Sequence, residues 1–385
     1  MRTVMPEAPD RFRARFPIFA AKTYLASCSQ GALSPEVRRA FDDYLDSWDR
    51  AGNAWGRWVE EAERLRSEFA ALIGAHPDEV AITFSASSAL NAITGALDLS
   101  QRSQLVTTAA DFPTVGQILL AQEQRGASVR FVPDRAGSIQ AEDLACCVDH
   151  RTALVVATQV SFLSGARLDV AAAAHAAHDA GALFCLDAYQ GAGVQVLDVR
   201  ELEVDFLVAG ALKYLLGPPG VAFVYARREV IPRLRPLDTG WFAQQEPFTF
   251  NGAELAYASS ARRLQSGSPP IPSVYGARAG IRLVDSVGVR TIQDHVATLT
   301  SRMLEGAAAA GYAVRTPTEP RQRGPLVVLA STDAEHLAAR LVQRGFVCSP
   351  RCDGLRVAFH YYNLEEDADR LLEALRPLEA LLVPA

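Results

Sequence analysis

The sequence predicts an α/β protein with one large and one smaller domain. A chain of 385 residues with 49% apolar residues can bury a large core and divide into two domains. Short apolar runs of the kind found in buried strands alternate with segments whose apolar residues have helical spacing. One such run ends in Asp187 and another leads to Lys213, so ionisable groups follow two of the expected strands.

The first 180 residues carry helix and strand signals in turn. Pro35 follows Ser34, a pattern typical of helix starts, and apolar residues at helical spacing extend this helix to about residue 48. A long amphipathic helix is expected from Trp55 to Ile73. The other elements expected here are strands at 80–84, 104–108 and 152–160, a helix directly after the first of these strands, and a helix at 171–180.

The second half continues with strands at 183–187 and 205–208, which are apolar apart from Asp187 and Asp205. From residue 274 onward, helices and short strands alternate again. The expected helices are 274–287, 291–309 and 364–375, and the expected strands are 325–329, 346–349 and 355–358. Proline-rich stretches at 267–272 and 317–325 indicate boundaries between these parts rather than disordered linkers.

Charge and cysteine usage exclude several classes of partner. The net charge is −6 with both signs mixed, so neither nucleic acid nor an anionic membrane is expected to bind. The six cysteines lack a disulfide spacing or a C-x-x-C pair, which is typical of reduced thiols. The N-terminus lacks an apolar signal region, and no run of about 18 apolar residues follows. A cytoplasmic, soluble protein is expected.

Lys213 and Asp187 predict the chemistry of the site. The chain has only one other lysine, Lys22, and a lysine after a buried strand has a lowered pKa and a nucleophilic amine. An aspartate at a strand end suits a protonated pyridine nitrogen, which it holds as an electron sink. The pair is therefore expected to bind pyridoxal phosphate (PLP). A purely structural buried ion pair is the alternative.

The junction between the expected strand 80–84 and the helix after it is a candidate anion site. Free backbone N–H groups and the positive end of the helix dipole meet there. The amide of Ala86 and the hydroxyl of Ser87 are the candidates for the PLP phosphate, although serine caps are common at any helix. No metal site is expected, since His175 and His178 lie in an alanine-rich helix without a third ligand nearby.

Four motifs, in this order along the chain, resemble one known family. The chain resembles the class V aminotransferase group of fold-type I PLP enzymes, which includes cysteine desulfurases, kynureninases and C–S lyases. The motifs are DAYQ at 187–190, ALKYLLGPPGVAFVY at 211–225, SGSP at 266–269 and LRVAFHYYN at 355–363.

The resemblance implies a large domain with a mostly parallel seven-stranded sheet and a smaller α+β C-terminal domain. On this basis we expect residues 59–273 to form the large PLP-binding domain and residues 274–385 the small domain. Residues 1–58 would form an N-terminal segment that packs on both.

The resemblance also implies contacts to the cofactor. Phe112 would stack on the pyridine ring, as in the kynureninase version of this loop, where desulfurases usually carry a histidine pair. Gln190 would donate to the phenolic oxygen, and Ser161 would contact that oxygen or the substrate. The usual Ser-x-His before the lysine is replaced by residues 210–212, so the phosphate must rely on other donors.

The resemblance also implies roles for residues that contact the phosphate and the substrate. Gly267 and Ser268 would reach the phosphate from a neighbouring subunit, which implies a homodimer with a shared active site. Arg356 would hold the α-carboxylate of an amino acid substrate, a contact that suits the guanidinium fork. The aromatic segment 239–250 is expected either to wall the substrate pocket or to pack at an interface.

Three cysteines are candidates for functional thiols. Cys28 lies in a turn-rich segment that borders the substrate in this family. We interpret Cys28 as a small loop residue rather than as a functional thiol. Cys348 and Cys352 lie in a loop shorter than the one that carries a desulfurase nucleophile, so both are interpreted as incidental.

The resulting hypothesis is a PLP-dependent lyase that acts on an α-amino acid, by β-elimination or C–S cleavage of a cysteine-type substrate. Lys213 would bind the cofactor through its amine and then act as general base and acid. An aminotransferase or a kynureninase-like C–C hydrolase of the same family is the alternative. An inactive scaffold with this fold is the non-enzyme alternative.

Overall fold

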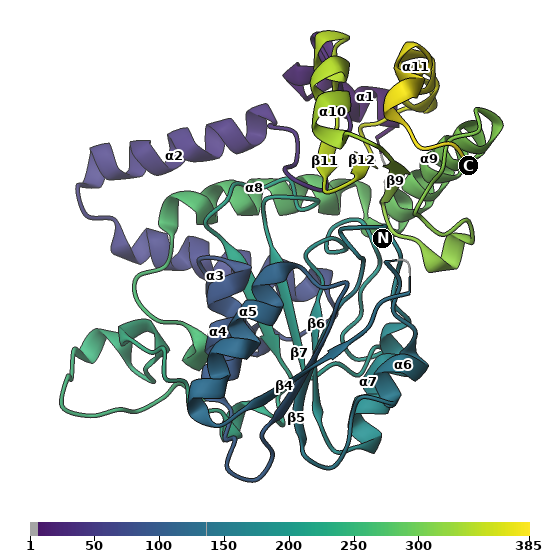
Figure 1. Cartoon of the computed structure of the whole chain (residues 1–385). Helices are drawn as coiled ribbons and strands as arrows, with labels where there is room; N and C mark the ends of the chain where they lie inside the picture. Colours follow the sequence, from purple (N-terminus) through teal and green to yellow (C-terminus); the bar gives the residue numbers. More distant parts are fainter. Residues whose placement is uncertain (1–6, 136) are drawn as a thin grey trace.

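The computed structural model describes residues 7–135 and 137–385 and is built around a seven-stranded sheet (Figure 1). The strand order is β2-β8-β7-β6-β5-β3-β4. β8 pairs antiparallel with both of its neighbours, and the other pairs are parallel. The strands are β2 (Val80–Thr83), β3 (Gln104–Thr108), β4 (Ser128–Val132), β5 (Thr152–Thr158), β6 (Leu183–Asp187), β7 (Phe206–Gly210) and β8 (Ala222–Ala226). The predicted mostly parallel seven-stranded sheet is confirmed.

Helices cover both faces of this sheet, which explains why most of its central strands are buried on both faces. In β5, Val155 packs with one face's core and Val156 with the other. One face is covered by α3 (Trp55–Leu72), α7 (Val170–Asp179) and α8 (Ile271–Val287), and the other by α4 (Ala86–Ala96) and α5 (Pro113–Ala121). The short α6 (Ala141–Ala145) packs beside α7.

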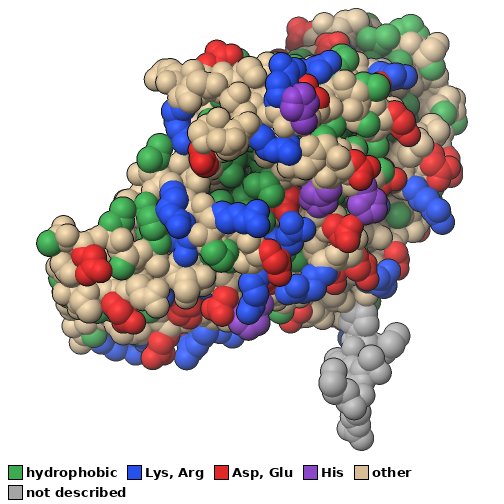
Figure 2. Space-filling model, turned by 90° about the horizontal axis from the view of Figure 1, so that it is seen from below, with side chains coloured by type: hydrophobic (Ala, Val, Ile, Leu, Met, Phe, Trp, Pro, Cys, Tyr) green, Lys and Arg blue, Asp and Glu red, His purple; other side chains and the backbone are tan. Residues whose placement is uncertain are grey.

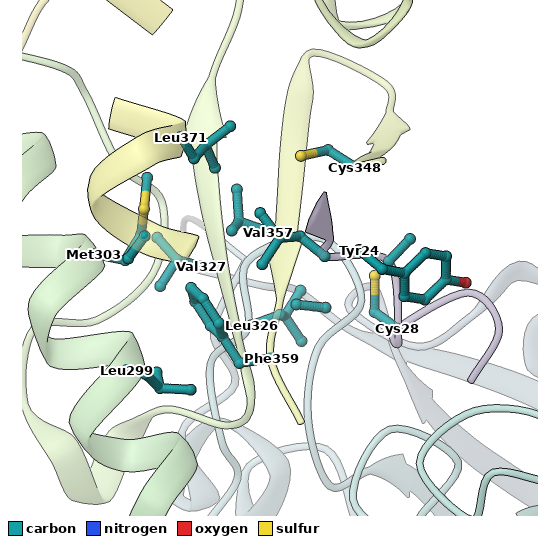
Figure 3. Packing of buried hydrophobic residues seen from close by; sticks show 14 of the residues in the cluster. Tyr24, Cys28, Leu299, Met303, Leu326, Val327, Cys348, Val357, Phe359 and Leu371 are labelled. Carbon is teal, nitrogen blue, oxygen red and sulfur yellow. The ribbon is translucent and has the colours of Figure 1, made fainter. Parts of the chain in front are cut away.

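A second sheet of three antiparallel strands, in the order β11-β12-β9, lies in the C-terminal part. Its strands are β9 (Leu326–Ala330), β11 (Ser349–Arg351) and β12 (Gly354–Ala358). Their apolar side chains form a core with α9 (Val289–Ala309), α10 (Ala334–Gln343) and α11 (Glu365–Leu375), part of which is drawn in Figure 3.

The N-terminal residues join this second core. β1 (Thr23–Tyr24) pairs with β10 (Phe346–Val347) in parallel, and Phe12 of α1 (Pro9–Ala14) is fully buried in the same cluster. α2 (Pro35–Ala51) leaves this region and packs along α8. The expected boundary at 273/274 falls inside α8, and the division into domains stays a prediction.

The expected elements agree with the structure, with one correction. The expected strand 346–349 is two strands, because the chain leaves its pairing with β1 after Val347 and pairs with β12 from Ser349. The expected strands 104–108 and 183–187 match β3 and β6 residue for residue. The edge strand β4 was missed, since most of its side chains are at least partly exposed and it has no continuous apolar signal.

The surface agrees with the mixed charge of the sequence. On the described part of the face shown in Figure 2, Lys and Arg side chains lie interspersed with Asp and Glu side chains. Among the helices of residues 7–135 and 137–385, none combines the length and the apolar character needed to cross a membrane.

Candidate active site

A cavity of about 360 Å³ lies at the carboxyl ends of β5, β6 and β7. Ligands of open parallel sheets bind at this edge, because the loops that follow the strands converge there. The start of α4 and the loop after β3 form one side of the cavity, and the loop after β1 and the β11–β12 hairpin form the other. The cavity therefore combines residues from segments far apart in the sequence.

Lys213 stands in the turn after β7 and lines this cavity. Its Nζ lies 4.4 Å from the centroid of the Tyr189 ring. Burial lowers the pKa of the Lys213 amine to about 8, although Asp187 works in the opposite direction. Gly210 permits this arrangement, since a Cβ there would lie 2.1 Å from Cζ of Tyr189. The pKa of the amine thus lies close to neutral pH, and the amine lies beside an aromatic ring.

Asp187 ends β6 and lines the same cavity, one strand away from the β7 turn that carries Lys213. The backbone N–H of Tyr189 donates to its Oδ1 at 2.9 Å. Burial raises the pKa of this carboxyl, and the Tyr189 amide and Lys213 partly offset the rise. A cation or a protonated nitrogen beside Asp187 would therefore stabilise the ionised carboxylate, because a buried charge is unfavourable without a partner.

Arg356 lies on β12, is 2% exposed and lines the cavity. Its Nη2 donates to the hydroxyls of Ser29 at 3.0 Å and Ser349 at 2.6 Å. No carboxylate among the described residues forms an ion pair with it. Two hydroxyls therefore fix the guanidinium while its charge stays available for an anionic ligand.

The residues expected at the cofactor's phosphate and ring also line the cavity. Ala86 and Ser87 form the first turn of α4, whose N-cap Ser85 accepts a hydrogen bond from the amide of Ser88 at 3.1 Å. The Phe112 ring, 45% exposed, meets the Phe162 ring edge-on at 5.1 Å. Uncapped amides of the α4 start and a free aromatic face are thus both present.

Gln190 is buried with half of its amide unused. Its Nε2 donates to the carbonyl of Cys28 at 3.1 Å, and its Oε1 has no partner among the residues that the structure describes. A buried amide oxygen without a partner is unfavourable, which indicates that the site is completed by a group from outside the chain.

Three predicted site residues do not reach this cavity. Ser161 is 3% exposed and accepts a hydrogen bond from the Leu163 amide at 3.2 Å, because it closes its own turn after β5. Gly267 and Ser268 lie outside the lining residues, and their contact with a partner subunit stays a prediction.

The aromatic segment 239–250 is also absent from the lining of this cavity, and its expected packing at an interface stays a prediction. It forms part of a lobe that extends away from the sheet, where Trp241 packs on Trp55 with ring centroids 5.6 Å apart (Figure 1).

Some lining residues were not predicted. Tyr189 faces the Lys213 amine, and Arg351 on β11 lines the cavity together with Arg356. Cys28 lines it as well, whereas Cys348 is buried elsewhere and Cys352 is exposed at a turn. The close spacing of Arg351 and Arg356 could have signalled a hairpin with two arginines. Cys28 belongs to the turn-rich segment that was expected to border the substrate, and the structure places it at the cavity.

The cavity residues fit PLP. An amine for the aldehyde, a carboxylate for the ring nitrogen and an aromatic face for the ring meet in one cavity, in Lys213, Asp187 and Phe112. The start of α4 offers donors for the phosphate. The predicted donation from Gln190 to the phenolic oxygen stays a prediction, since its Nε2 donates to the carbonyl of Cys28 and its unpaired atom is the acceptor Oε1.

Comparisons with known proteins agree with this fit. The family model "Aminotransferase class-V" matches residues 23–371. "Uncharacterized aminotransferase YcbU" of Bacillus subtilis is 37% identical over 96% of this chain and 98% of its own length. A kynureninase of Deinococcus radiodurans is 28% identical over 90% of this chain and 87% of its own. An apo cysteine desulfurase structure from Thermococcus onnurineus superposes with a TM-score of 0.87 at 22% identity, over 98% of this chain and 99% of that one, and shows the shared fold.

Proposed function

Since the chain belongs to the class V aminotransferase family of PLP-dependent enzymes, we propose that it is a lyase acting on a cysteine-type α-amino acid. The reaction would be β-elimination or cleavage of the C–S bond. The proposal rests above all on one observation, that the Lys213 amine, with its pKa near 8, shares a cavity with Asp187 and Arg356.

Each of these residues has a defined task at the cofactor or the substrate. Lys213 would hold the cofactor covalently through its amine, and Asp187 would keep the ring nitrogen protonated. PLP, when bound, supplies an electron sink for the charge that develops at Cα. Arg356 would grip the α-carboxylate in two-point contact and so orient the bonds at Cα.

Lys213 is also the proton-moving group. An amine with a pKa near 8 has both protonation states accessible at neutral pH, as a general base and acid requires. It would take the proton from Cα and could return one to the product. Tyr189 is a poorer candidate, because burial and the charge of Asp187 raise the pKa of its phenol well above the usual value.

The shortage of further acid–base groups favours a sulfur leaving group. Among the described residues that line the cavity, Asp187 is the only carboxylate and none is a histidine. A thiol has a pKa of about 8.5, so a thiolate departs without being protonated first. C–S cleavage therefore needs one acid–base residue, whereas hydrolysis of a C–C bond needs a second group to activate water.

Two alternatives have specific support. Transamination also needs only the lysine, and a relative with 37% identity has "aminotransferase" in its name. Kynureninase-like C–C hydrolysis is favoured by Phe112 on the ring side of the cavity and by the 28% identical kynureninase.

The three reactions separate in one assay. PLP-loaded protein is incubated with L-cystine, an S-conjugate of L-cysteine or L-kynurenine, with and without a 2-keto acid. The lyase releases pyruvate and ammonia without the keto acid, whereas turnover that requires the keto acid contradicts the proposal. Cleavage of kynurenine alone would support the hydrolase. Lys213→Ala should abolish turnover. Lys22→Ala changes the only other lysine of the chain, which is exposed, and should leave turnover unchanged.

We further propose a cytoplasmic homodimer in which Gly267 and Ser268 reach the neighbouring cavity. In support, the lobe that precedes them exposes two large aromatic side chains, Phe248 (52%) and Phe250 (75%). All six cysteines are free, which agrees with a reducing compartment. Light scattering should give twice the monomer mass, and Ser268→Ala should weaken PLP binding. A monomer that binds PLP fully would contradict the shared site.

A further inference from the structure

Arg351 and Arg356 lie on the same face of the β11–β12 hairpin. Ser349 is paired directly with Arg356, and Arg351 is two residues beyond Ser349 on the same strand. Side chains two residues apart on a strand point to the same side, so Arg351 is the diagonal neighbour of Arg356, with Cα atoms roughly 7–8 Å apart. Both line the cavity that contains Lys213.

The charge of Arg351 is not neutralised within the described part of the chain. No ion pair or side-chain hydrogen bond there involves its guanidinium. The nearest acidic residue in the sequence, Asp353, pairs with Arg315 instead. Asp187 is the only carboxylate among the described lining residues, and it lies at the end of β6 on the sheet side.

The charge of Arg351 affects the pKa of Lys213 inside the cavity. Burial is the main reason that the pKa of Lys213 is low, and Arg356 and Arg351 lower it further. Lys213, Arg351 and Arg356 therefore give the cavity three basic groups against one acidic group. A cavity with this excess favours anionic ligands.

The anions that the proposed function already requires have other partners. The phosphate of the cofactor has donors at the start of α4, and the α-carboxylate of the substrate is assigned to Arg356. Arg351 is left, on the same face as Arg356 and open to the cavity.

We propose that Arg351 binds a second anionic group, carried on the side chain or leaving group of the substrate. The preferred substrates are then α-amino acids with an acidic side chain, such as a cysteine derivative that ends in a carboxylate or a sulfur oxyacid. This inference rests on the proposed function, because it takes Arg356 as the anchor of the α-carboxylate.

The test compares ligands that differ in charge but hardly in shape. S-Carboxymethyl-L-cysteine is paired with S-carbamoylmethyl-L-cysteine, and L-glutamate with L-glutamine. The Kd of each is measured with PLP-loaded protein from the shift of the cofactor's absorption. Because Arg351 is exposed, its charge-assisted contact should favour the acid of each pair by about two- to fivefold.

Variants locate the preference. Arg351→Gln should bind each acid about as weakly as its amide and leave the amide's Kd within about twofold, since only the charged contact is lost. Arg351→Lys should retain part of the preference, because the charge remains without the fork. Arg340→Gln on α10 is the matched control, an exposed arginine outside the cavity, and should behave as the parent.

Each other role for Arg351 gives a different result. Equal weakening of acid and amide in Arg351→Gln would place Arg351 on the α-carboxylate, and weaker PLP binding would place it on the phosphate. If the parent protein binds the acid and the amide of each pair equally well, the inference is overturned, and no variant is needed to show this. If no amino acid shifts the absorption of PLP-loaded protein, the proposed function fails, and this inference fails with it.

Discussion

The titration of the Lys213 amine can be followed directly in protein freed of PLP. Only the neutral amine attacks an aldehyde, so the rate of PLP capture should follow the neutral fraction. With a pKa of about 8, roughly a tenth of the amine is neutral at pH 7, against about one part in 2,500 for an ordinary lysine with a pKa of 10.4. We therefore expect the capture rate to rise about tenfold per pH unit below pH 8 and to level off above it.

Stopped-flow absorbance after mixing with PLP, at pH values from 6 to about 10.5, measures this profile, corrected for the titration of PLP itself. Asp187→Asn removes the carboxylate that holds the pKa of Lys213 up, so the midpoint should move to lower pH. Lys22→Ala should leave the profile unchanged. A midpoint near pH 10 in the parent protein would refute the claim that burial prepares this amine for reaction.

Two further changes test the surroundings of the site. Gly210→Ala places a Cβ 2.1 Å from Cζ of Tyr189, so the ring must leave its present position beside Lys213. We expect a loss of about 1–3 kcal/mol in the free energy of unfolding by urea and a weaker PLP complex, and unchanged values for both would contradict the packing. Burial raises the pKa of Asp111 to about 7, although Thr107 donates to its carboxylate. Between about pH 4 and 7 the native state then binds a proton that the unfolded state has lost, so stability should fall as pH rises through this window, by up to about 1.4 kcal/mol per pH unit from this group. Asp111→Asn should remove that component of the slope, and a variant with the parent's slope would show that Asp111 is not the titrating group.

Much of the fold could be predicted from local sequence because the central strands are buried on both faces. β6 is an apolar run that ends in Asp187, and β3 combines Leu and Val with β-branched Thr, residue types favoured in strands. Their neighbour β4 is an edge strand with mostly exposed or half-exposed side chains, and the same signal is missing there. The strand expected at 346–349 divides in two because its halves pair with different partners, which no local pattern encodes.

The candidate site divides in the same way. Asp187 and Lys213 were predictable, since each follows an apolar strand and parallel strands end at one edge of the sheet. Ser161 was predicted to contact the cofactor or the substrate, but it does not line the cavity and accepts a hydrogen bond from the amide of Leu163. Arg351 needed the register of β11 against β12, which places it beside Arg356 on the cavity face.

The sequence alone thus determined the chemical type of this protein, because an amine and a carboxylate at strand ends and four ordered motifs are local features. Only the tertiary structure decided which distant groups share the cavity with them. Ser29 and Arg356, 327 residues apart, meet there through a hydrogen bond of 3.0 Å. The physical reason is that strand pairing and core packing bring such segments together, and both depend on contacts between residues that are remote in the chain.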